Sequence, residues 1–219
     1  MLTIAEMYDL SDTLAAPLLR GKTYPWEALD GIGDFILALG STLPESEYEH
    51  RDVDVWVARD ATVFPSAYLH GPCIIGHGAE VRHCAFIRGN AFVGEHCVVG
   101  NSTELKNVLL LGHVQVPHYN YVGDSILGSY SHMGAGSITS NVKSDKSLVV
   151  VRMGQEQVAT GRKKVGAFLG DHVEVGCGSV LNPGTVIGPG SQVYPLSCVR
   201  GVVPAGSIYK RQGEIAQKR

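Results

Sequence analysis

His118 is the side chain of this 219-residue sequence best suited to acid–base chemistry. It lies in the stretch "VPHYNYVGD", directly after Pro117, where the chain interrupts a long and regular repeat. A neutral imidazole near its usual pKa takes up a proton at physiological pH, which suits a general base. The alternative is that His118 is only a turn residue beside a proline, and the residue type alone leaves both interpretations open.

Arg88 and Lys106 form a second candidate group. They are 18 residues apart, and each directly follows an aliphatic residue, Ile87 or Leu105. In a fold that returns to the same corner every 18 residues, they would lie one above the other. Two cations about 5 Å apart repel by roughly 1–3 kcal/mol, depending on the local dielectric. An anion between them would reverse the sign, and phosphate is the natural candidate. The alternative is a solvated basic strip that costs little.

A six-residue repeat predicts the elements that position these side chains. Aliphatic residues recur at every sixth position from Val57 to Leu111 and again from Leu169 to Val199. No α-helix has this period, whereas three short strands make one triangular coil of 18 residues in a parallel β-helix, and such coils stack at about 4.8 Å. The aliphatic residues then point inward. The sequence therefore predicts an all-β fold, a parallel β-helix of hexapeptide repeats.

Small residues follow the aliphatic positions four residues later, where the corners of the coil would be tight. Two of these positions hold Cys73 and Cys97. A free cysteine behaves as a small apolar side chain. We therefore expect both cysteines to pack in the interior.

Three segments lack the repeat. Residues 1–51 predict a small N-terminal cap of two amphipathic helices, and such a cap would cover the open edge of the first coil. Within the β-helix of residues 52–208, residues 141–164 predict an inserted, hairpin-like excursion with a basic end. Residues 209–219 predict a basic C-terminal tail that is a short helix or loose.

Composition excludes several classes of function. The formal net charge of −3 argues against a broad nucleic-acid-binding surface. The sequence predicts no membrane association, because no apolar run reaches the roughly 18 residues of a membrane span. The N-terminus is unlike a secretory signal, and the 5 cysteines include no CxxC pair, which favours reduced thiols in a cytoplasm. No glycine-rich nucleotide loop is present, so we expect no nucleotidyltransferase domain.

A long fragment carries a resemblance to a known family. It reads "FIRGNAFVGEHCVVGNSTELKNVLLLGHVQVPHYNYVGDSILGSYSHMGAGSITSN". It resembles the acetyltransferase domain of the bacterial bifunctional glucosamine-1-phosphate acetyltransferase / N-acetylglucosamine-1-phosphate uridyltransferase, and more closely the C-terminal domains of archaeal-type sugar-1-phosphate nucleotidyltransferases. The resemblance covers roughly residues 60 to 205. It implies a left-handed β-helix, an exception to the usual right-handed crossover, and a homotrimer with active sites between subunits.

The resemblance also implies a reaction. An acetyl group would move from acetyl-CoA to the amine of an amino-sugar 1-phosphate or a sugar nucleotide, in the chemistry that surrounds UDP-N-acetylglucosamine. No metal would be required. Because the amine must lose a proton as it attacks the thioester, a nearby imidazole would assist it, typically by 10²–10⁴-fold.

Individual residues match the motifs of this family. Arg88 in "IRGN" and Lys106 in "NSTELKN" match the arginine and lysine that hold the sugar phosphate. His118 in "PHYNYVGD" matches the general base, and Tyr121 matches a tyrosine that contacts the substrate. Asn141 in "GAGSITSN" matches an asparagine of the substrate site.

The donor side of the site matches less completely. Ala135 matches a position that lines acetyl-CoA, and the resemblance places the coenzyme along the later coils, near Ala135, Cys177 and Arg200. A solvent-facing corner thiol explains Cys177 equally well. His132 stands where the bacterial enzymes have an asparagine, which makes it a candidate for substrate contact, and Val142 replaces the tyrosine of their "NYDG" motif. These departures leave the amino sugar and the acyl donor open.

A zinc protein is one alternative. The stretch "GHVQVPH" places His113 and His118 with four residues between them, and γ-class carbonic anhydrase-like proteins use a similar motif to bind zinc across a subunit interface. Zinc would need a third histidine. The candidates are His77, His83 and His96.

A non-catalytic protein is the other alternative. The same β-helix serves as a trimerising or sugar-phosphate-binding module in the nucleotidyltransferase family. Binding of coenzyme A distinguishes the enzyme from such a module.

Overall fold

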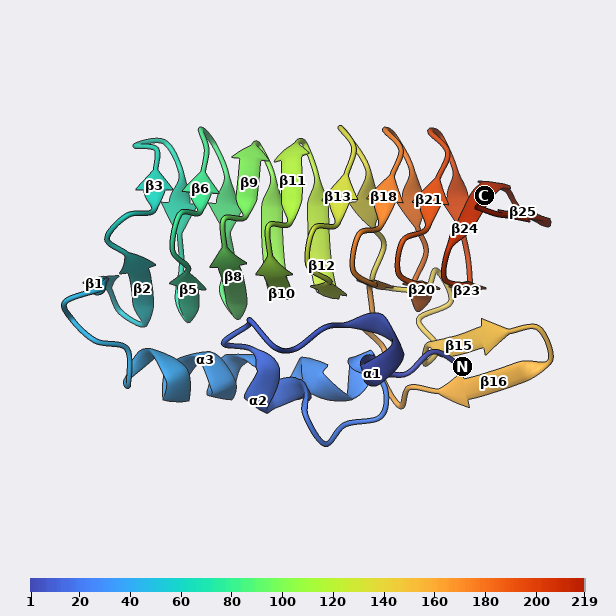
Figure 1. The fold of residues 1–219 in the computed structure, drawn as a ribbon, viewed down its shortest axis with the longest axis horizontal. Helices are drawn as coiled ribbons and strands as arrows, with labels where there is room; N and C mark the ends of the chain where they lie inside the picture. Colours follow the sequence, from blue (N-terminus) through green and yellow to red (C-terminus); the bar gives the residue numbers. More distant parts are fainter. Residues whose placement is uncertain (219) are drawn as a thin grey trace.

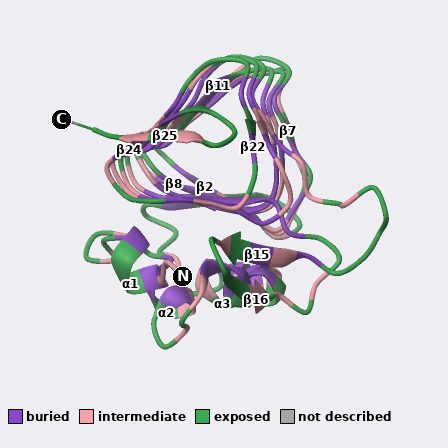
Figure 2. Cartoon of the chain, turned by 90° about the vertical axis from the view of Figure 1, so that its right-hand side faces the viewer, coloured by how far each residue is buried: buried purple, intermediate pink, exposed green. Residues whose placement is uncertain are grey.

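The computed structural model describes residues 1–218, which form a β-solenoid of about nine turns with a helical segment along one side (Figure 1). Viewed along its axis, each coil is a triangle with a purple, buried inner surface (Figure 2). The chain is mostly β, and the neighbouring strands of successive coils run parallel. The predicted parallel β-helix of hexapeptide repeats is confirmed.

Three columns of strands make the three faces of the solenoid. Face 1 contains β2 (Val55–Ala58), β5 (Cys73–Ile75), β8 (Ala91–Glu95), the second half of β10 (Glu104–Gly112), the second half of β12 (Tyr121–Leu127), β17 (Ala167–Leu169), β20 (Thr185–Ile187) and β23 (Val202–Val203). Face 2 contains β3 (Thr62–Val63), β6 (Glu80–Val81), β9 (Val98–Asn101), β11 (Gln115–His118), β13 (His132–Met133), β18 (Glu174–Val175), β21 (Gln192–Val193) and β24 (Ser207–Arg211). Face 3 contains β4 (Tyr68–Leu69), β7 (Phe86–Ile87), the first halves of β10 and β12, β14 (Ile138–Thr139), β19 (Val180–Leu181) and β22 (Cys198–Val199).

The interior of the solenoid is a narrow core of aliphatic side chains. Val57, Ile75 and Val93 stack in register, one coil apart, and are fully buried. Cys73 and Cys97 are free, fully buried members of the same core, as predicted from their small-residue positions. Burial raises the pKa of both thiols to about 12. Their role is therefore packing.

Two successive coils depart from the repeat, and the first departure follows Leu105. Leu105 pairs with Ile87, 18 residues earlier, whereas Leu110 pairs with Val93, 17 residues earlier. The corner between them is thus one residue shorter than in the preceding coil. As a result Leu110 belongs to the inner core and Leu111 to a second cluster outside the solenoid. The prediction that Leu111 points inward is wrong.

Face 1 is buried on both sides. The residue before each inward aliphatic side chain is also apolar and points outward, against the N-terminal segment; these residues are Ile74, Phe92, Leu109, Ile126, Phe168 and Val186. A strand with two buried sides reads as a continuous apolar run, as "CII" and "AFL" do. Face 1 therefore has a second hydrophobic core on its outer side.

The N-terminal segment supplies the other half of this second core. It contains α1 (Ile4–Met7), α2 (Ala16–Leu19), the 3-10 helix η1 (Pro25–Gly31), α3 (Ile32–Gly40) and β1 (Tyr48–Asp52). These helices lie along face 1 instead of over the open end of the first coil (Figure 1). The edge of the first coil is covered by β1, which pairs antiparallel with β2. The predicted position of the cap is wrong because the apolar surface that needs covering is the long side of the solenoid.

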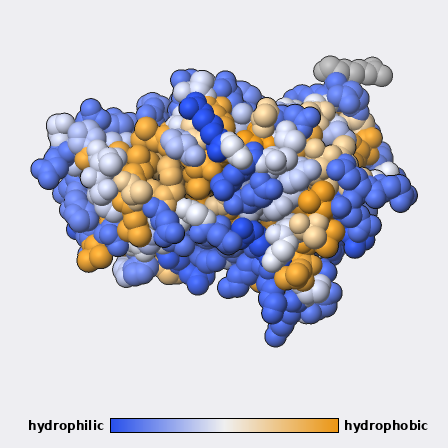
Figure 3. Space-filling model, turned by 90° about the horizontal axis from the view of Figure 1, so that it is seen from below, coloured by the Kyte–Doolittle hydropathy of each residue, from blue (hydrophilic) through white to orange (hydrophobic). Residues whose placement is uncertain are grey.

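The outer surface of this segment is polar. Seen from the side of the helices, the molecule is mostly hydrophilic, with separate apolar patches (Figure 3). None of the helices within residues 1–218 is long and apolar enough to cross a membrane.

The excursion leaves the solenoid between β14 and β17. Between β12 and β17 the register jumps by 42 residues. The chain first completes one coil through β13 and β14, and then forms an antiparallel hairpin, β15 (Val150–Met153) and β16 (Glu156–Ala159). Val149, Val151 and Val165 are buried in the outer core. The excursion is therefore packed against the body of the protein.

The C-terminal tail is neither helical nor loose. β24 continues face 2 up to Arg211, and β25 (Glu214–Gln217) folds back antiparallel to it, with Tyr209 opposite Ile215. The predicted boundary at residue 209 thus falls within a strand, and the last residue of the predicted tail lies outside the described residues. The tail prediction is wrong because β24 pairs with β21 as one more rung of face 2.

Candidate functional site

The corner that joins face 3 to face 1 holds a buried polar network. We name corner 3–1 the turns at residues 88–90, 106–107, 123–124 and 140–141 and the equivalent positions of the other coils. Asp124 is only 3% exposed there and accepts hydrogen bonds from Lys106 Nζ at 2.9 Å, Asn107 Nδ2 at 3.0 Å and Asn141 Nδ2 at 2.6 Å. Lys106 and Asn107 belong to the coil before Asp124, and Asn141 belongs to the coil after it. Asp124 therefore ties three coils together and offsets the charge of Lys106.

The shortened turns explain why this network forms here. Asn107 and Asp124 occupy equivalent positions of two successive short corners, with φ of 55° and 49°. Asn and Asp tolerate this left-handed conformation better than most residues. Sequence reasoning identified Lys106 and Asn141 but missed Asn107 and Asp124. The signal was the spacing from Leu105 to Leu110, which is one residue shorter than the equivalent spacing from Ile87 to Val93.

Tyr121 lies beside this network on face 3. Its hydroxyl accepts a hydrogen bond from Asn141 Nδ2 at 3.2 Å. Partial burial raises the pKa of Tyr121, and the carboxylates of Asp124 and Glu104 raise it further. The phenol therefore stays protonated and can donate a hydrogen bond. The structure thus brings the predicted residues Lys106, Tyr121 and Asn141 together.

Arg88 stacks one coil away from Lys106, as the spacing predicted. Leu105 pairs with Ile87, and the Arg88 amide donates to the carbonyl of Leu105. The exposed guanidinium, however, donates to Glu104 at 2.6 Å, and this hydrogen bond raises the pKa of Arg88. Each of the two cations thus has its own carboxylate. The argument from unrelieved repulsion between them therefore fails, although their proximity holds.

His118 lies at a different corner, the one that joins face 2 to face 3. We name corner 2–3 the turns at residues 117–120, 134–137 and 176–179 and the equivalent positions of the other coils. The Gly136 amide donates to the carbonyl of His118, and the Gly178 amide donates to the carbonyl of Ala135. His118, Ala135 and Cys177 therefore follow one another along this corner, and all three are exposed. The structure thus groups the predicted base with two of the predicted donor-site residues.

The His118 side chain is available for chemistry. Its ring makes no hydrogen bond to any residue that the structure describes. Nearby, the Gly134 and Gly136 amides are used by the carbonyls of Val175 and His118. The exposed Ala135 amide between them donates to no acceptor within residues 1–218. The turns at residues 117–120 and 134–137 therefore present the imidazole of His118 and the N–H of Ala135 to the solvent.

Asn120 fixes the backbone of His118 and was missed by sequence reasoning. It is 2% exposed, and its Oδ1 accepts the amide hydrogen of His118 at 3.1 Å. Its Nδ2 donates to the carbonyls of Gly134 at 2.9 Å and Ser137 at 3.0 Å. Equivalent positions of the neighbouring coils hold small residues such as Thr103 and Ser137. An asparagine in a small-residue position is the signal that could have revealed it.

Gly100 lets this part of the chain sit close to the preceding coil. A Cβ at Gly100 would lie 1.6 Å from the carbonyl oxygen of Pro117. The backbone that leads into His118 therefore rests directly on the Gly100 backbone. Glycine is required at position 100 because any side chain would collide with the Pro117 backbone, and not because of a positive φ angle.

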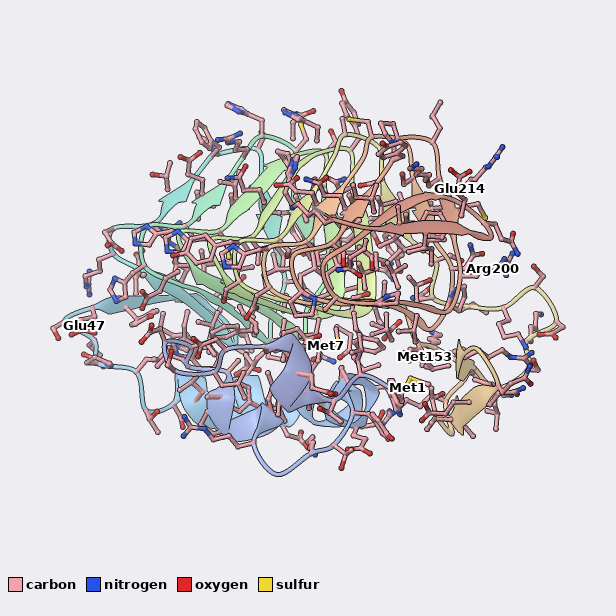
Figure 4. The ribbon with its side chains drawn as sticks, turned by 45° about the vertical axis from the view of Figure 1, so that its right-hand side comes forward. Met1, Met7, Glu47, Met153, Arg200 and Glu214 are labelled. Carbon is pink, nitrogen blue, oxygen red and sulfur yellow. The ribbon has the colours of Figure 1, made fainter. Side chains whose placement is uncertain are left out.

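The remaining predicted residues lie apart from these groups. His132 Nδ1 contacts Glu174 Oε2 at 2.8 Å on the outer side of face 2. Arg200 is at corner 3–1 of a late coil, at the end of the molecule where the excursion lies (Figure 4). It lines a cavity of about 280 Å³ together with Lys143 and Arg152. Arg200 does not share a corner with Ala135.

A single chain keeps the two groups apart. His118 lies where face 3 begins and Lys106 where it ends, so the width of the face separates them, roughly 10 Å at about 3.3 Å per residue. An acceptor that contacts both must therefore span face 3.

The histidines of the zinc alternative do not converge in one chain. His113 is at the corner between faces 1 and 2, in a stack of rings with His96 and Tyr130 at centroid distances of 4.9 and 4.4 Å. His118 is at corner 2–3. Within residues 1–218, no group of three or more His, Cys, Asp or Glu side chains is placed to hold a metal ion.

Comparison with known proteins identifies the family. Residues 69–187, more than half of the chain, match the family described as GMPPB C-terminal domain. The chain belongs to this family. The match includes every predicted site residue except Arg200.

The family member is also similar to several curated proteins. It is 32% identical over 156 residues to a bifunctional sugar-1-phosphate nucleotidylyltransferase/acetyltransferase of Sulfurisphaera tokodaii, covering 71% of this chain and 39% of that protein. It is 34% identical over 143 residues to a bifunctional protein GlmU of Methanococcus vannielii, covering 64% of this chain and 34% of that protein. The chain therefore spans less than half the length of these relatives.

Among solved structures, a hexapeptide transferase family protein of Anaplasma phagocytophilum is similar to this GMPPB C-terminal domain family member. The TM-score is 0.42 with 17% identity, covering 75% of this chain and 80% of that chain.

Proposed function

We propose that this protein is an N-acetyltransferase that moves an acetyl group from acetyl-CoA to the amine of an amino-sugar 1-phosphate or a sugar nucleotide. The observation that carries the proposal is the exposed, unpartnered imidazole of His118, held in place by buried Asn120 at a corner shared with Ala135 and Cys177. The similarity to the Sulfurisphaera protein, which is named as an acetyltransferase as well as a nucleotidylyltransferase, supports the reaction class.

The chemistry follows from the available groups. The acceptor amine attacks the carbonyl carbon of the thioester, so that a C–N bond forms and the C–S bond breaks. His118 takes the proton that the amine loses and returns it to the leaving thiolate. The free N–H of Ala135 can stabilise the oxyanion that develops on the carbonyl. The reaction balances without a metal or a redox partner.

The acceptor would bind at corner 3–1. Lys106 and Arg88 are the cations for its phosphate, while Tyr121 and Asn141 provide neutral hydrogen-bonding groups for the sugar. Both cations start from ion pairs with Asp124 and Glu104. A phosphate would therefore share them with these carboxylates. His132 is available for a further sugar contact.

A homotrimer would complete the site. Within one chain, His118 and Lys106 lie at opposite borders of face 3, and Arg200 is separated from Ala135. A neighbouring copy packed against face 3 would supply the missing wall, with acetyl-CoA between the two chains. The outer side of face 3 exposes Tyr68 and Phe86, 60% and 40% accessible, which suits such a contact.

The expected compartment is the cytoplasm. All 5 cysteines are free thiols. A reducing environment, which also holds acetyl-CoA and sugar phosphates, agrees with this state. UDP-N-acetylglucosamine is the nucleotide sugar to which the proposed product is related.

The test is release of free thiol from acetyl-CoA by metal-stripped protein. Glucosamine 1-phosphate, galactosamine 1-phosphate and UDP-glucosamine serve as acceptors, and N-acetylated product is verified by mass. We expect turnover without added metal. No thiol release above the buffer rate with any of the three acceptors would overturn the proposed function, and coenzyme A binding without turnover would indicate a non-catalytic protein.

A further inference from the structure

A cavity of about 500 Å³ lies between corner 3–1, the end of η1 and the returning strand of the excursion. Its walls come from three distant parts of the sequence: Leu29 and Asp30, then Asn90, Lys106, Asn107 and Asp124, and finally residues 161–164. This volume is within the range of small-molecule sites. The cavity therefore adjoins the acceptor site but extends beyond it, toward the excursion.

The charge of the cavity is unbalanced. Four cations line it, and two of them are paired, Lys106 with Asp124 and Arg162 with Asp30. Lys163 and Lys164 are exposed and form no ion pair with any residue that the structure describes. The cavity thus has two uncompensated positive charges, both on the excursion. Two adjacent lysines match a group with more than one negative charge.

The backbone that carries these lysines is held in place. Lys164 forms an antiparallel bridge with Val142, and the Val165 amide donates to the carbonyl of Asn141 at 3.0 Å. The Val149 amide donates to the carbonyl of Arg162 at 2.8 Å. The Arg162 side chain is tied to η1 through Asp30. The returning strand is therefore pre-organised beside Asn141.

Asp124 does not repel an anion strongly from this cavity. Its carboxylate accepts three hydrogen bonds and is 3% exposed, so its charge is largely satisfied by Lys106, Asn107 and Asn141. Lys163 and Lys164 are the cations of the cavity that have no carboxylate partner within residues 1–218. The paired Lys106 then borders the sugar side of the cavity.

We propose that this cavity binds the second phosphate, the one on the nucleoside side, of a nucleoside-diphosphate sugar, so that the acceptor is a nucleoside-diphosphate amino sugar. This inference rests on the proposed function. A monophosphate can use Arg88 and Lys106 alone, whereas the two lysines of the excursion lie farther along the same cavity, where a second phosphate would reach. The excursion thus selects the acceptor class.

Two measurements test the site, and one is independent of catalysis. Calorimetry compares binding of inorganic pyrophosphate and inorganic phosphate to the natural protein and to the double variant Lys163→Gln/Lys164→Gln. We expect pyrophosphate to bind about tenfold more tightly than phosphate, and the double variant to lose this difference. Lys146→Gln is the matched control, because Lys146 is an exposed lysine of the same excursion outside the cavity. Equal pyrophosphate affinity in the natural protein and the double variant would overturn the inference.

The second measurement is kinetic. UDP-glucosamine and glucosamine 1-phosphate share the amine and differ in the second phosphate and nucleoside. We expect kcat/KM to favour UDP-glucosamine by about tenfold, and the double variant to lose this preference through KM, with kcat/KM for glucosamine 1-phosphate unchanged. Acetylation of both acceptors without preference would sink the inference and leave the proposed function standing. Lysine-dependent pyrophosphate binding without acetylation of either acceptor would do the reverse.

Discussion

Corner 2–3 and corner 3–1 are built by opposite means. Around His118 the turns keep the spacing of the repeat, the amides of Gly136 and Gly178 donate to carbonyls of the preceding coil, and buried Asn120 accepts the amide hydrogen of His118. Around Asp124 the turns are shortened, and the chain then leaves the solenoid for the excursion. One corner preserves the repeat and places a single side chain. The other breaks the repeat and builds a cavity.

The comparison shows what a repetitive fold can and cannot supply. A regular stack presents one residue per coil at a fixed spacing, which is sufficient for one general base. A binding site for a charged sugar needs donors from several directions. Corner 3–1 obtains them by loss of one residue at each of two turns and by the insertion of a segment that returns with two lysines.

The largest effect should come from the regular corner. His118→Ala should lower kcat by 10²–10⁴-fold, because the amine then has no base, while the mass of the assembly and the stability stay unchanged. The assay is thiol release at saturating acetyl-CoA.

His83→Ala is the matched control for that variant. His83 is an exposed histidine of the same corner two coils earlier, and its carbonyl accepts the amide hydrogen of Ser102. We expect it to keep full activity. Equal rates for His118→Ala and the natural protein would mean that the exposed imidazole is not the base.

Sequence alone predicted the inner half of the fold. The six-residue spacing predicted which side chains face the interior, because a narrow triangular core leaves room for one aliphatic residue per strand. It did not predict the outer core on face 1. The signal was present in the paired apolar residues such as Ile74–Ile75 and Phe168–Leu169, but the period of the repeat says nothing about what covers a face.

The site was predicted in the same uneven way. Lys106, Tyr121 and Asn141 were named from motifs and do lie together. Asp124 was missed because its role depends on three-dimensional closure of two shortened turns. The repulsion between Arg88 and Lys106 was overestimated for a related reason. Glu104 neutralises Arg88 and Asp124 neutralises Lys106. The prediction considered only the two stacked cations and not the carboxylates beside them.

The irregular corner should depend on Asp124 for stability. Asp124→Ala leaves the partly buried Lys106 without its carboxylate and removes one of the two acceptors of the Asn107 and Asn141 amides, so we expect the free energy of unfolding to fall by about 2–3 kcal/mol. Urea denaturation measures the change in midpoint at constant m-value. Glu104→Gln is the control, because Glu104 pairs with an exposed arginine, and its midpoint should not move. A negligible change in Asp124→Ala would mean that the network does not hold corner 3–1 together.

The smallest effect should separate positioning from packing at corner 2–3. Asn120→Ser restores the kind of small residue that neighbouring coils use, and serine and threonine there donate to nearby carbonyls, as Ser137 Oγ does to Gly134 and Thr103 Oγ1 does to Val116. The free energy of unfolding should therefore change by only about 1 kcal/mol. The His118 amide, however, loses its side-chain acceptor. We expect kcat to fall by about three- to tenfold, with KM for the acceptor unchanged. A loss of stability without any change in kcat would show that Asn120 only fills the corner, and the difference between the two corners would then lie in the position of His118 alone.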